Sequence, residues 1–373
     1  MKNIVFIKLS LILILSLFLI PCHGFLYYNE VSARSSAMGG AFYSLDDDPS
    51  VLYYNPAGIA GLKQSCFLFT YLVKSESNKE FGEENRFVSG AFVVFKTKLL
   101  NLGFGYIKPL SHGEKNHIYT YESSYWSKEV EYNKYIFTFA KQLEKMPLRI
   151  GININLHEIN GTRNWTIYDS VWGGIVETVD LNLKSDVLTC DIGLQYDLFN
   201  FLTLGVSIKQ GRGFYYDVDM QYVSIYDCYP SGYIIEDIIP WEYNLGLKFN
   251  YKSMIFSAFT NQAEWSSTSE YETYYYNLLE EECLSNSYPT DNLVNWGAGL
   301  EIKPFENELC VRSGYKNQTA DDYKLTFTSY GLGLIVKNIY FDVSYTEIKY
   351  ELKSGNIKMR REYNSNYSIG YKF

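Results

Sequence analysis

The residue types that most often carry catalysis or bind metals are few in this sequence. After the first 24 residues there are three histidines, and two of them, His112 and His117, have no cysteine or carboxylate at the spacing of a metal site. The third, His157, falls at the end of a predicted strand. The GxSxG, HExxH and phosphate-binding-loop motifs are missing from the sequence. We therefore expect no enzyme activity, no cofactor and no metal site.

Five cysteines follow residue 24, and an odd number cannot form a complete disulfide framework. Cys66, Cys190 and Cys310 lie in strand-like runs, where a cysteine acts as a small hydrophobic residue. Cys228 and Cys283 lie in two long polar segments and could pair in an oxidising compartment.

Residues 264–290 combine acidic and aromatic side chains, with six glutamates and no lysine or arginine. The aromatic residues that could contact a ligand are Trp265, Tyr274, Tyr275 and Tyr276. One interpretation is a platform that binds an apolar or sugar ligand on its aromatic faces and cations on its carboxylates. The alternative is a solvated loop whose tyrosines pack on neighbouring loops.

Apolar and polar residues alternate with period two from residue 64 to the end of the chain. In one such stretch Ile150, Ile152, Ile154 and Leu156 alternate with Gly151, Asn153, Asn155 and His157. The polar positions favour Gly, Asn, Ser and Thr, whereas the exposed face of a soluble sheet is rich in Lys and Glu. The chain is also unusually aromatic, with 36 tyrosines against 27 glycines. This pattern is typical of a transmembrane β-barrel with aromatic girdles.

The alternating segments number fourteen, an even count as in bacterial single-chain barrels. The predicted strands are 64–74, 86–96, 98–108, 132–143, 147–158, 185–197, 200–210, 240–251, 253–263, 291–303, 308–317, 322–336, 338–350 and 362–373. The connections between them alternate between short turns and longer segments, the longest being 109–131, 159–184, 211–239 and 264–290. The sequence therefore predicts an all-β fold, an antiparallel barrel over 63–373 with tight periplasmic turns and long outer loops.

The N-terminus predicts export. Lys2 and Lys8 precede an apolar run over 9–20, and Cys22-His23-Gly24 supplies small residues before a cleavage point, so 1–24 is interpreted as a signal peptide. An uncleaved anchor is disfavoured, because about 12 apolar residues are too few to span a bilayer.

Residues 25–62 do not alternate and contain small residues, including the pair Gly39-Gly40. We expect this segment to fold inside the barrel as a plug. The alternative is a cap on the periplasmic side.

The stretch SSAMGGAFYSLDDDPSVLYYNPAGIAGL, residues 35–62, resembles the N-terminal hatch of FadL-type outer-membrane long-chain fatty-acid transporters and their relatives. The shared pattern is a Gly/Ala-rich run, a DDPS step at 47–50 and NPAG at 55–58. The segments 238–249 and 311–318 are also similar to strands of that broader family.

The resemblance implies that a hydrophobic small molecule, a long-chain fatty acid or similar, passes beside the hatch and leaves through a lateral opening into the outer membrane. Asn55, Pro56, Ala57 and Gly58 would then belong to the part of the hatch that gates the path. Alternatively, NPAG only turns the chain from a short helix into the first strand. The broader family also includes PorV-like secretion partners, so a non-transporting surface protein or adhesin is the competing function.

The C-terminus ends in Tyr-Ser-Ile-Gly-Tyr-Lys-Phe, which resembles the signal that the barrel-assembly machinery recognises, with Phe373 last. The nearby basic residues Lys358, Arg360 and Arg361 could meet anionic outer-membrane lipids or lie in a solvated turn. The formal net charge of −9 argues against a nucleic-acid partner.

Overall fold

The computed structural model of the protein describes residues 30–76, 84–114, 124–168, 175–215, 217–224, 230–264, 272–276, 293–305, 308–319, 323–352 and 360–373. The predicted signal peptide, 1–24, lies outside these residues. None of the helices among them has the length and apolar character needed to cross a membrane.

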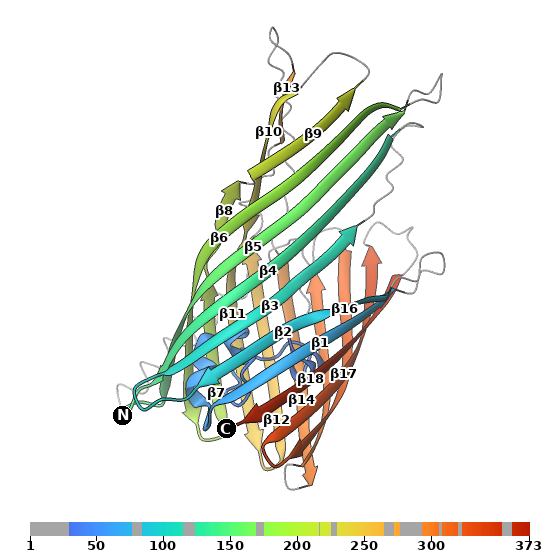
Figure 1. Ribbon diagram of the computed structural model, residues 1–373. Coiled ribbons are helices and arrows are strands. Elements are labelled where there is room, and N and C mark those ends of the chain that lie inside the picture. The colour runs from blue at the N-terminus through green and yellow to red at the C-terminus, as the bar shows by residue number, and fades with distance from the viewer. Residues whose placement is uncertain are drawn as a thin grey trace.

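Fourteen antiparallel strands form a closed barrel, as predicted (Figure 1). Each is hydrogen-bonded to the next in chain order, and β18 pairs with β1, so no strand of the wall keeps a free edge along its whole length. Closure satisfies the backbone groups that lipid cannot hydrogen-bond. The wall strands are β1 (Cys66–Glu76), β2 (Glu84–Phe95), β3 (Asn101–Glu114), β4 (Ser124–Gln142), β5 (Leu148–Tyr168), β6 (Ile175–Phe199), β7 (Leu202–Lys209), β11 (Trp241–Tyr251), β12 (Met254–Glu264), β14 (Leu293–Phe305), β15 (Leu309–Thr319), β16 (Tyr323–Val336), β17 (Ile339–Leu352) and β18 (Arg360–Lys372).

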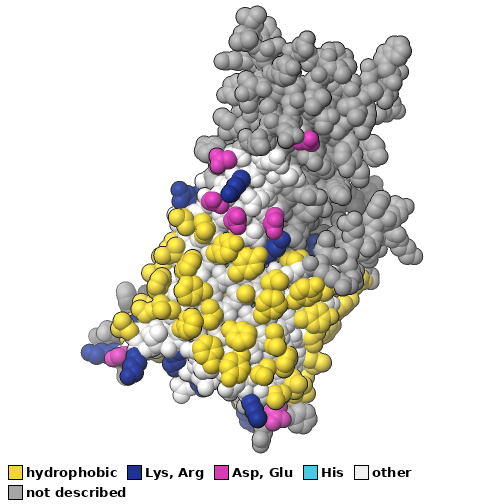
Figure 2. All heavy atoms as spheres, viewed as in Figure 1, with side chains coloured by type: hydrophobic (Ala, Val, Ile, Leu, Met, Phe, Trp, Pro, Cys, Tyr) yellow, Lys and Arg dark blue, Asp and Glu magenta, His cyan; other side chains and the backbone are white. Residues whose placement is uncertain are grey.

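Side chains alternate between the two faces of the wall. On β5, Ile152 and Ile154 are each 47% exposed on the outside, whereas Asn153 and Asn155 are fully buried in the lumen. The outward residues form an apolar belt around the barrel (Figure 2). This belt matches the hydrocarbon layer that such strands cross.

The long outer connections predicted from the sequence are partly strand, so the predicted outer bounds of several strands were wrong. Strands β4, β5 and β6 have 19, 21 and 25 residues and rise well beyond the belt (Figure 1), although about 9–11 residues span a bilayer. Four further strands lie in the predicted loops: β8 (Arg212–Tyr215), β9 (Asp217–Ser224), β10 (Pro230–Ile239) and β13 (Glu272–Tyr276). β9 extends the edge of β6, while β8, β10 and β13 form a separate sheet. Outside the membrane a ladder needs no apolar lipid-facing side, so the alternation that revealed the crossings does not mark these extensions.

The N-terminal segment, 30–62, lies inside the lower half of the barrel (Figure 1). It contains α2 (Ala33–Ala37), α3 (Val51–Tyr54) and the 3-10 helix η1 (Pro56–Gly61). Its apolar side chains form one core with inward residues of the wall. This position is compatible with the predicted plug.

Candidate functional site

The NPAG motif lies against the wall formed by β5, β6 and β7. The Asn55 side chain donates hydrogen bonds to the carbonyl oxygens of Tyr43 (2.9 Å), Leu194 (3.0 Å) and Val206 (3.3 Å). Its oxygen accepts from the Ala57 N–H (3.1 Å) and so caps η1. Asn55 therefore ties the N-terminal segment to two strands of the wall at once.

Wall glycines allow this close approach. A Cβ at Gly193 of β6 would lie 2.0 Å from Asn55 Oδ1, and one at Gly151 of β5 would lie 2.4 Å from the Pro56 carbonyl carbon. Gly58 packs on Leu45 and on Val51 within the segment itself. The motif thus packs the segment against the wall and turns the chain toward β1. These contacts support the turn interpretation of NPAG, and its gating role stays a prediction.

The opposite side of the segment is held by buried charges on β14, β15 and β17. Arg34 Nε lies 2.8 Å from Glu301, and Arg312 Nε lies 2.6 Å from the same carboxylate. Arg312 also pairs with Asp342, and Arg34 with Asp47 (2.8 Å). The Glu301 side chain is fully buried. A carboxylate shared by two arginines compensates the cost of burying all three charges.

The remaining acids of the DDDPS step also have wall or local partners. Asp46 pairs with Arg149 of β5 and with Lys248 of β11 (2.6 Å). Asp48 accepts hydrogen bonds from Ser50 (2.6 and 2.8 Å) and lies 3.8 Å from Arg34. Burial raises the pKa of the Asp48 carboxyl against the opposing effect of Arg34. The acidic step is therefore an anchor inside the lumen.

Among the described residues, the β2–β3 ladder covers only part of the two strands. It joins Gly90–Phe95 to Leu102–Ile107 and ends there, although both strands continue toward the outer end, where they diverge (Figure 1). The β1–β2 register shifts at Thr70/Tyr71, and the β3–β4 register shifts between Ile107 and Leu110. Pro109, which lacks an N–H donor, sits in that second shift, as expected for proline in a sheet. We refer to the unpaired region beyond Gly90 and Ile107 as the β2–β3 gap.

Part of the lumen beside the β2–β3 gap is apolar. Five buried apolar residues of β1–β4 form what we name the apolar sector: Leu68, Phe92, Val94, Ile107 and Ile136. Buried polar side chains, among them Thr70, Ser89 and Lys134, lie on the same strands. The apolar sector shares one core with Val31, Leu52 and Ile59 of the N-terminal segment. Ile107 belongs to the last pair of this ladder and Phe92 lies two residues from Gly90, the partner of Ile107, so the apolar sector reaches the gap.

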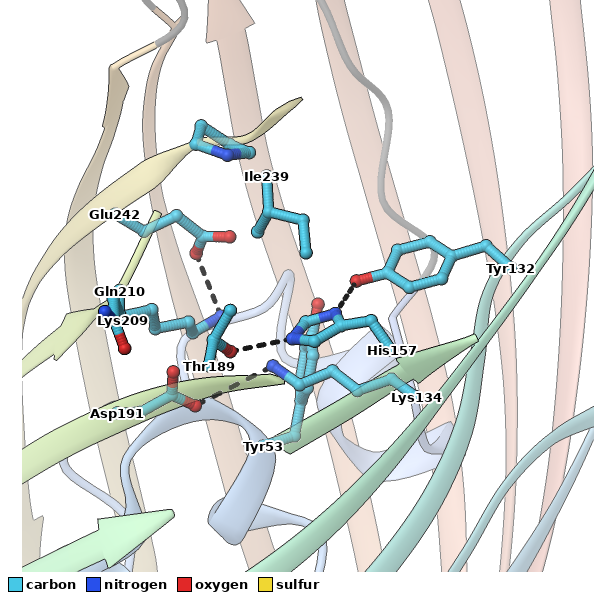
Figure 3. A pocket seen from close by; sticks show the side chains of 11 residues that line it. Tyr53, Tyr132, Lys134, His157, Thr189, Asp191, Lys209, Gln210, Ile239 and Glu242 are labelled. Atoms are coloured by element: carbon cyan, nitrogen blue, oxygen red, sulfur yellow. Dashed lines mark hydrogen bonds and ion pairs between the residues drawn. The ribbon is translucent and has the colours of Figure 1, made fainter. Parts of the chain in front are cut away.

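A polar cluster lines a pocket on the outer side of the segment (Figure 3). His157 bonds to the hydroxyls of Tyr132 and Thr189 (2.7 Å to Thr189). Lys209 pairs with Glu242 (2.9 Å) and lies 4.4 Å from the Tyr53 ring centroid.

Lys134 of this polar cluster lies 3.7 Å from Asp191 Oδ2. The other oxygen, Asp191 Oδ1, is buried and accepts no hydrogen bond from the described residues. The pocket is thus lined by two ion-paired ammonium groups, those of Lys134 and Lys209, and by one carboxylate oxygen that could accept a bond from a small polar group.

The structure corrects the expectation for His157. It is 1% exposed and part of the polar cluster rather than a residue at a strand end. Sequence reasoning missed Lys134, Asp191, Lys209 and Glu242. All four are charged residues within predicted wall strands, a signal that could have marked the lumen.

The other predicted contacts are only partly described. Tyr274, Tyr275 and Tyr276 lie in β13, with Tyr274 opposite Tyr233 of β10. Trp265, His117, Cys228, Cys283 and Lys358 lie outside the described residues. Cys66, Cys190 and Cys310 are free thiols. Within the described part of the chain, no group of three or more His, Cys, Asp or Glu side chains could hold a metal.

The architecture is shared with solved channel structures. No protein-family model matches the chain, and no curated protein matches it in sequence. The CymD monoaromatic hydrocarbon channel superposes with a TM-score of 0.73 at 12% identity, covering 92% of this chain and 97% of that one. The Ralstonia pickettii toluene transporter TbuX gives 0.68 at 13% identity, covering 94% and 99%. The P. putida toluene transporter TodX gives 0.59 at 15% identity, covering 92% and 98%. The resemblance to FadL-type transporters is thus confirmed for the fold: this chain has the fold of these fourteen-stranded channels.

Proposed function

We propose that this chain is a channel of the outer membrane for hydrophobic small molecules, and not an enzyme. The observation that carries the proposal is the β2–β3 gap, because it adjoins the apolar sector of the lumen. A route through the wall must break a ladder somewhere, since an intact ladder leaves no passage between strands. The fold likeness to channels for monoaromatic hydrocarbons and toluene supports the same class of cargo.

The proposed route has three parts. A molecule is captured at the outer end, reaches the lumen above the N-terminal segment, and moves along the apolar sector to the gap. It then enters the bilayer sideways, so it does not cross the anchored contacts of NPAG. The segment itself is the floor of this route, because Leu52 and Ile59 pack against wall residues of β3.

The polar cluster favours an amphiphile as the cargo. A pure hydrocarbon would gain nothing from Lys134 or from the free oxygen of Asp191, and leaving that oxygen buried without a partner costs free energy. The polar head of an amphiphile could accept a hydrogen bond from Lys134 while its tail contacts the apolar sector. A head that also carries a donor, such as a hydroxyl or a protonated carboxyl group, could donate to Asp191 Oδ1 as well. We therefore propose long-chain fatty acids or similar amphiphiles, ahead of toluene-like molecules.

Closing the gap covalently tests the route. In a background without native cysteines, the Val88→Cys, Lys108→Cys pair would be linked by a bismaleimide across the gap. The control pair, Tyr71→Cys and Val88→Cys, joins residues that are already opposite each other in the β1–β2 ladder. Cellular uptake of radiolabelled oleate and toluene is measured before and after linkage.

Linkage across the gap is expected to reduce uptake to the level of cells that lack the protein, while linkage of the control pair leaves uptake intact. Unchanged uptake after complete linkage would rule out the gap as the exit. If the cargo is an amphiphile, linkage across the gap should abolish uptake of oleate and leave the smaller, unassisted uptake of toluene unchanged.

A non-transporting surface protein remains the second candidate, because β4–β6 and the sheet of β8, β10 and β13 rise above the belt as a large outer surface. The two functions differ in bound cargo. Mass spectrometry of the detergent-purified protein should find a co-purified amphiphile if it is a channel. Absence of bound amphiphile together with normal uptake in a deletion strain would favour the surface protein.

A further inference from the structure

The end of the barrel that carries the short turns is rich in exposed lysines. We name them the lysine rim: Lys63, Lys96, Lys98, Lys141, Lys145, Lys252 and Lys337. The exposed carboxylates of the described turns are Glu144 and Glu308. This end is therefore strongly cationic, although the whole chain has a net charge of −9.

The rim lysines differ in their pairing from lysines at the opposite end of the barrel. None of its seven ammonium groups forms an ion pair within the part of the chain that the structure describes. At the opposite end, three lysines do pair with acids: Lys74 with Glu362 (3.5 Å), Lys108 with Glu131 (2.6 Å) and Lys349 with Glu347 (3.7 Å). The positive charge of the rim is thus left for something outside the chain.

The rim lies at the boundary of the apolar belt. Lys96 follows Phe95, Lys252 follows Tyr251, and Lys141 continues the exposed face of Phe139. Basic side chains gather along the lower edge of the belt in the face that Figure 2 shows. A lysine stem can lie along apolar surface while its ammonium group reaches the aqueous boundary. The rim ammonium groups are therefore at the depth of lipid head groups.

Two rim lysines occupy backbone positions that ordinarily select other residues. Lys252 and Lys337 have φ of 52° and 55° in the two-residue turns β11–β12 and β16–β17. Glycine and asparagine are the favoured types there, because a side chain at positive φ is strained. The turn geometry does not explain a lysine at either position. We therefore attribute the choice of lysine to its positive charge.

We propose that the lysine rim binds the head groups of anionic phospholipids in the leaflet at the short-turn end. Each ammonium group would lie beside a lipid phosphate, and the attraction would fall as salt screens it. This surface goes beyond the channel function, since it would act equally in a barrel that transports nothing.

Lipid retention in nanodiscs tests the proposal. The protein is reconstituted in an equimolar mixture of phosphatidylcholine and phosphatidylglycerol, and native mass spectrometry counts each lipid retained on the barrel. The test variant is Lys96→Gln, Lys98→Gln, Lys252→Gln, Lys337→Gln. The matched control removes four lysines from the other end: Lys108→Gln, Lys184→Gln, Lys324→Gln, Lys349→Gln. A third variant replaces the four rim lysines by arginine, and heat-modified mobility in SDS gels verifies folding of all three.

The wild-type protein should retain several-fold more phosphatidylglycerol than phosphatidylcholine, and the preference should fall when salt rises from about 0.05 to about 0.5 M. The rim glutamine variant should lose it, while the arginine and control variants keep it. Equal retention of both lipids by the wild type would overturn the proposal, as would equal loss in the control variant. The proposal would also be overturned if the wild-type protein bound an acidic protein and showed no preference between the two lipids.

Discussion

The N-terminal segment meets two different surfaces inside the barrel. Toward β5–β7 and β14–β17, which we call the anchored sector, it contacts glycine backbone, hydrogen-bonding amides and buried ion pairs. Toward β1–β4 it contacts mainly the apolar sector, with single hydrogen bonds from Thr70 and Asn101. Ion pairs and backbone contacts have defined geometry, whereas apolar contacts are non-directional. The anchored sector therefore fixes where the segment sits, and the apolar sector leaves it freer to shift.

The β2–β3 gap lies in the freer half. A wall that opens where the segment is anchored would require broken ion pairs, each costly when buried. Opening beside the apolar sector breaks no ion pair with the segment in the described residues; it disturbs apolar contacts, which a hydrophobic molecule can replace, and a few hydrogen bonds such as Thr70 to Val31. The asymmetry of the lumen is thus itself an argument for the place of the exit.

The largest expected effect is at the shared carboxylate of the anchored sector. Glu301→Gln leaves Arg34 and Arg312 buried without their common anion. We expect the free energy of unfolding to fall by about 3–5 kcal/mol, measured by urea unfolding in detergent with tryptophan fluorescence. Glu308→Gln, exposed at the start of β15, is the control and should change little. Equal stability of the two variants would mean that the ion pairs do not anchor the segment.

A smaller loss of stability is expected where the backbone of the N-terminal segment packs directly against a glycine of the wall. A Cβ at Gly314 of β15 would lie 2.2 Å from the backbone nitrogen of Gly39. Gly314→Ala should therefore cost about 1–3 kcal/mol through overpacking and expose the segment to protease. The neighbouring Ser313→Ala faces outward and should resist protease like the wild type. A stable, protease-resistant Gly314→Ala protein would show that the segment does not need this close contact.

The sequence was sufficient to predict the barrel, because the membrane imposes a period-two pattern on each crossing. All fourteen predicted strands are found. For β4 and β5 the bounds agree within one residue at the short-turn ends and differ by eight or more residues at the outer ends. The outer extensions escaped prediction since water solvates both faces of a sheet above the belt. The segment 25–62 stood out by its lack of alternation, its small residues and its DDPS and NPAG motifs.

The site was less predictable for a different reason. The NPAG and DDDPS residues are recognisable in sequence, but their partners, such as Gly193, Glu301 and Lys248, are far away along the chain. The period-two alternation shows which residues of a strand point into the lumen. It does not show which strands face each other across the barrel. The β2–β3 gap could not be predicted from the sequence either. Pro109 indicates a local irregularity in β3, but it does not indicate that β2 and β3 lose their pairing.

Removing the amide of NPAG separates anchoring from gating. Asn55→Ala loses a cap and the bonds to the Leu194 and Val206 carbonyls, which should cost about 1–2 kcal/mol. Because these contacts lie away from the gap, folded Asn55→Ala protein should take up oleate at the wild-type rate. Asn101→Ala, which removes one bond from β3 to Ile59 (2.7 Å), is its counterpart on the other side. An uptake change specific to Asn55→Ala would establish the gating role instead.

The variant with the smallest expected loss of stability, Thr70→Val, should change the rate of uptake and so tests the route most directly. The Thr70 hydroxyl is fully buried at the shifted β1–β2 register, where it contacts the Val31 carbonyl (2.9 Å), the Ser89 hydroxyl (2.9 Å) and the Gly90 carbonyl (3.0 Å). Thr70→Val keeps the shape and removes these bonds, at a cost of about 0.5–1.5 kcal/mol. The outer part of β2 then has less to hold it beside the segment, so uptake should rise. Thr260→Val removes a comparable bond to the Asn295 carbonyl (3.3 Å) within an intact ladder and should leave uptake unchanged. If both variants change uptake alike, general loosening of the wall explains the effect and the position of the gap does not.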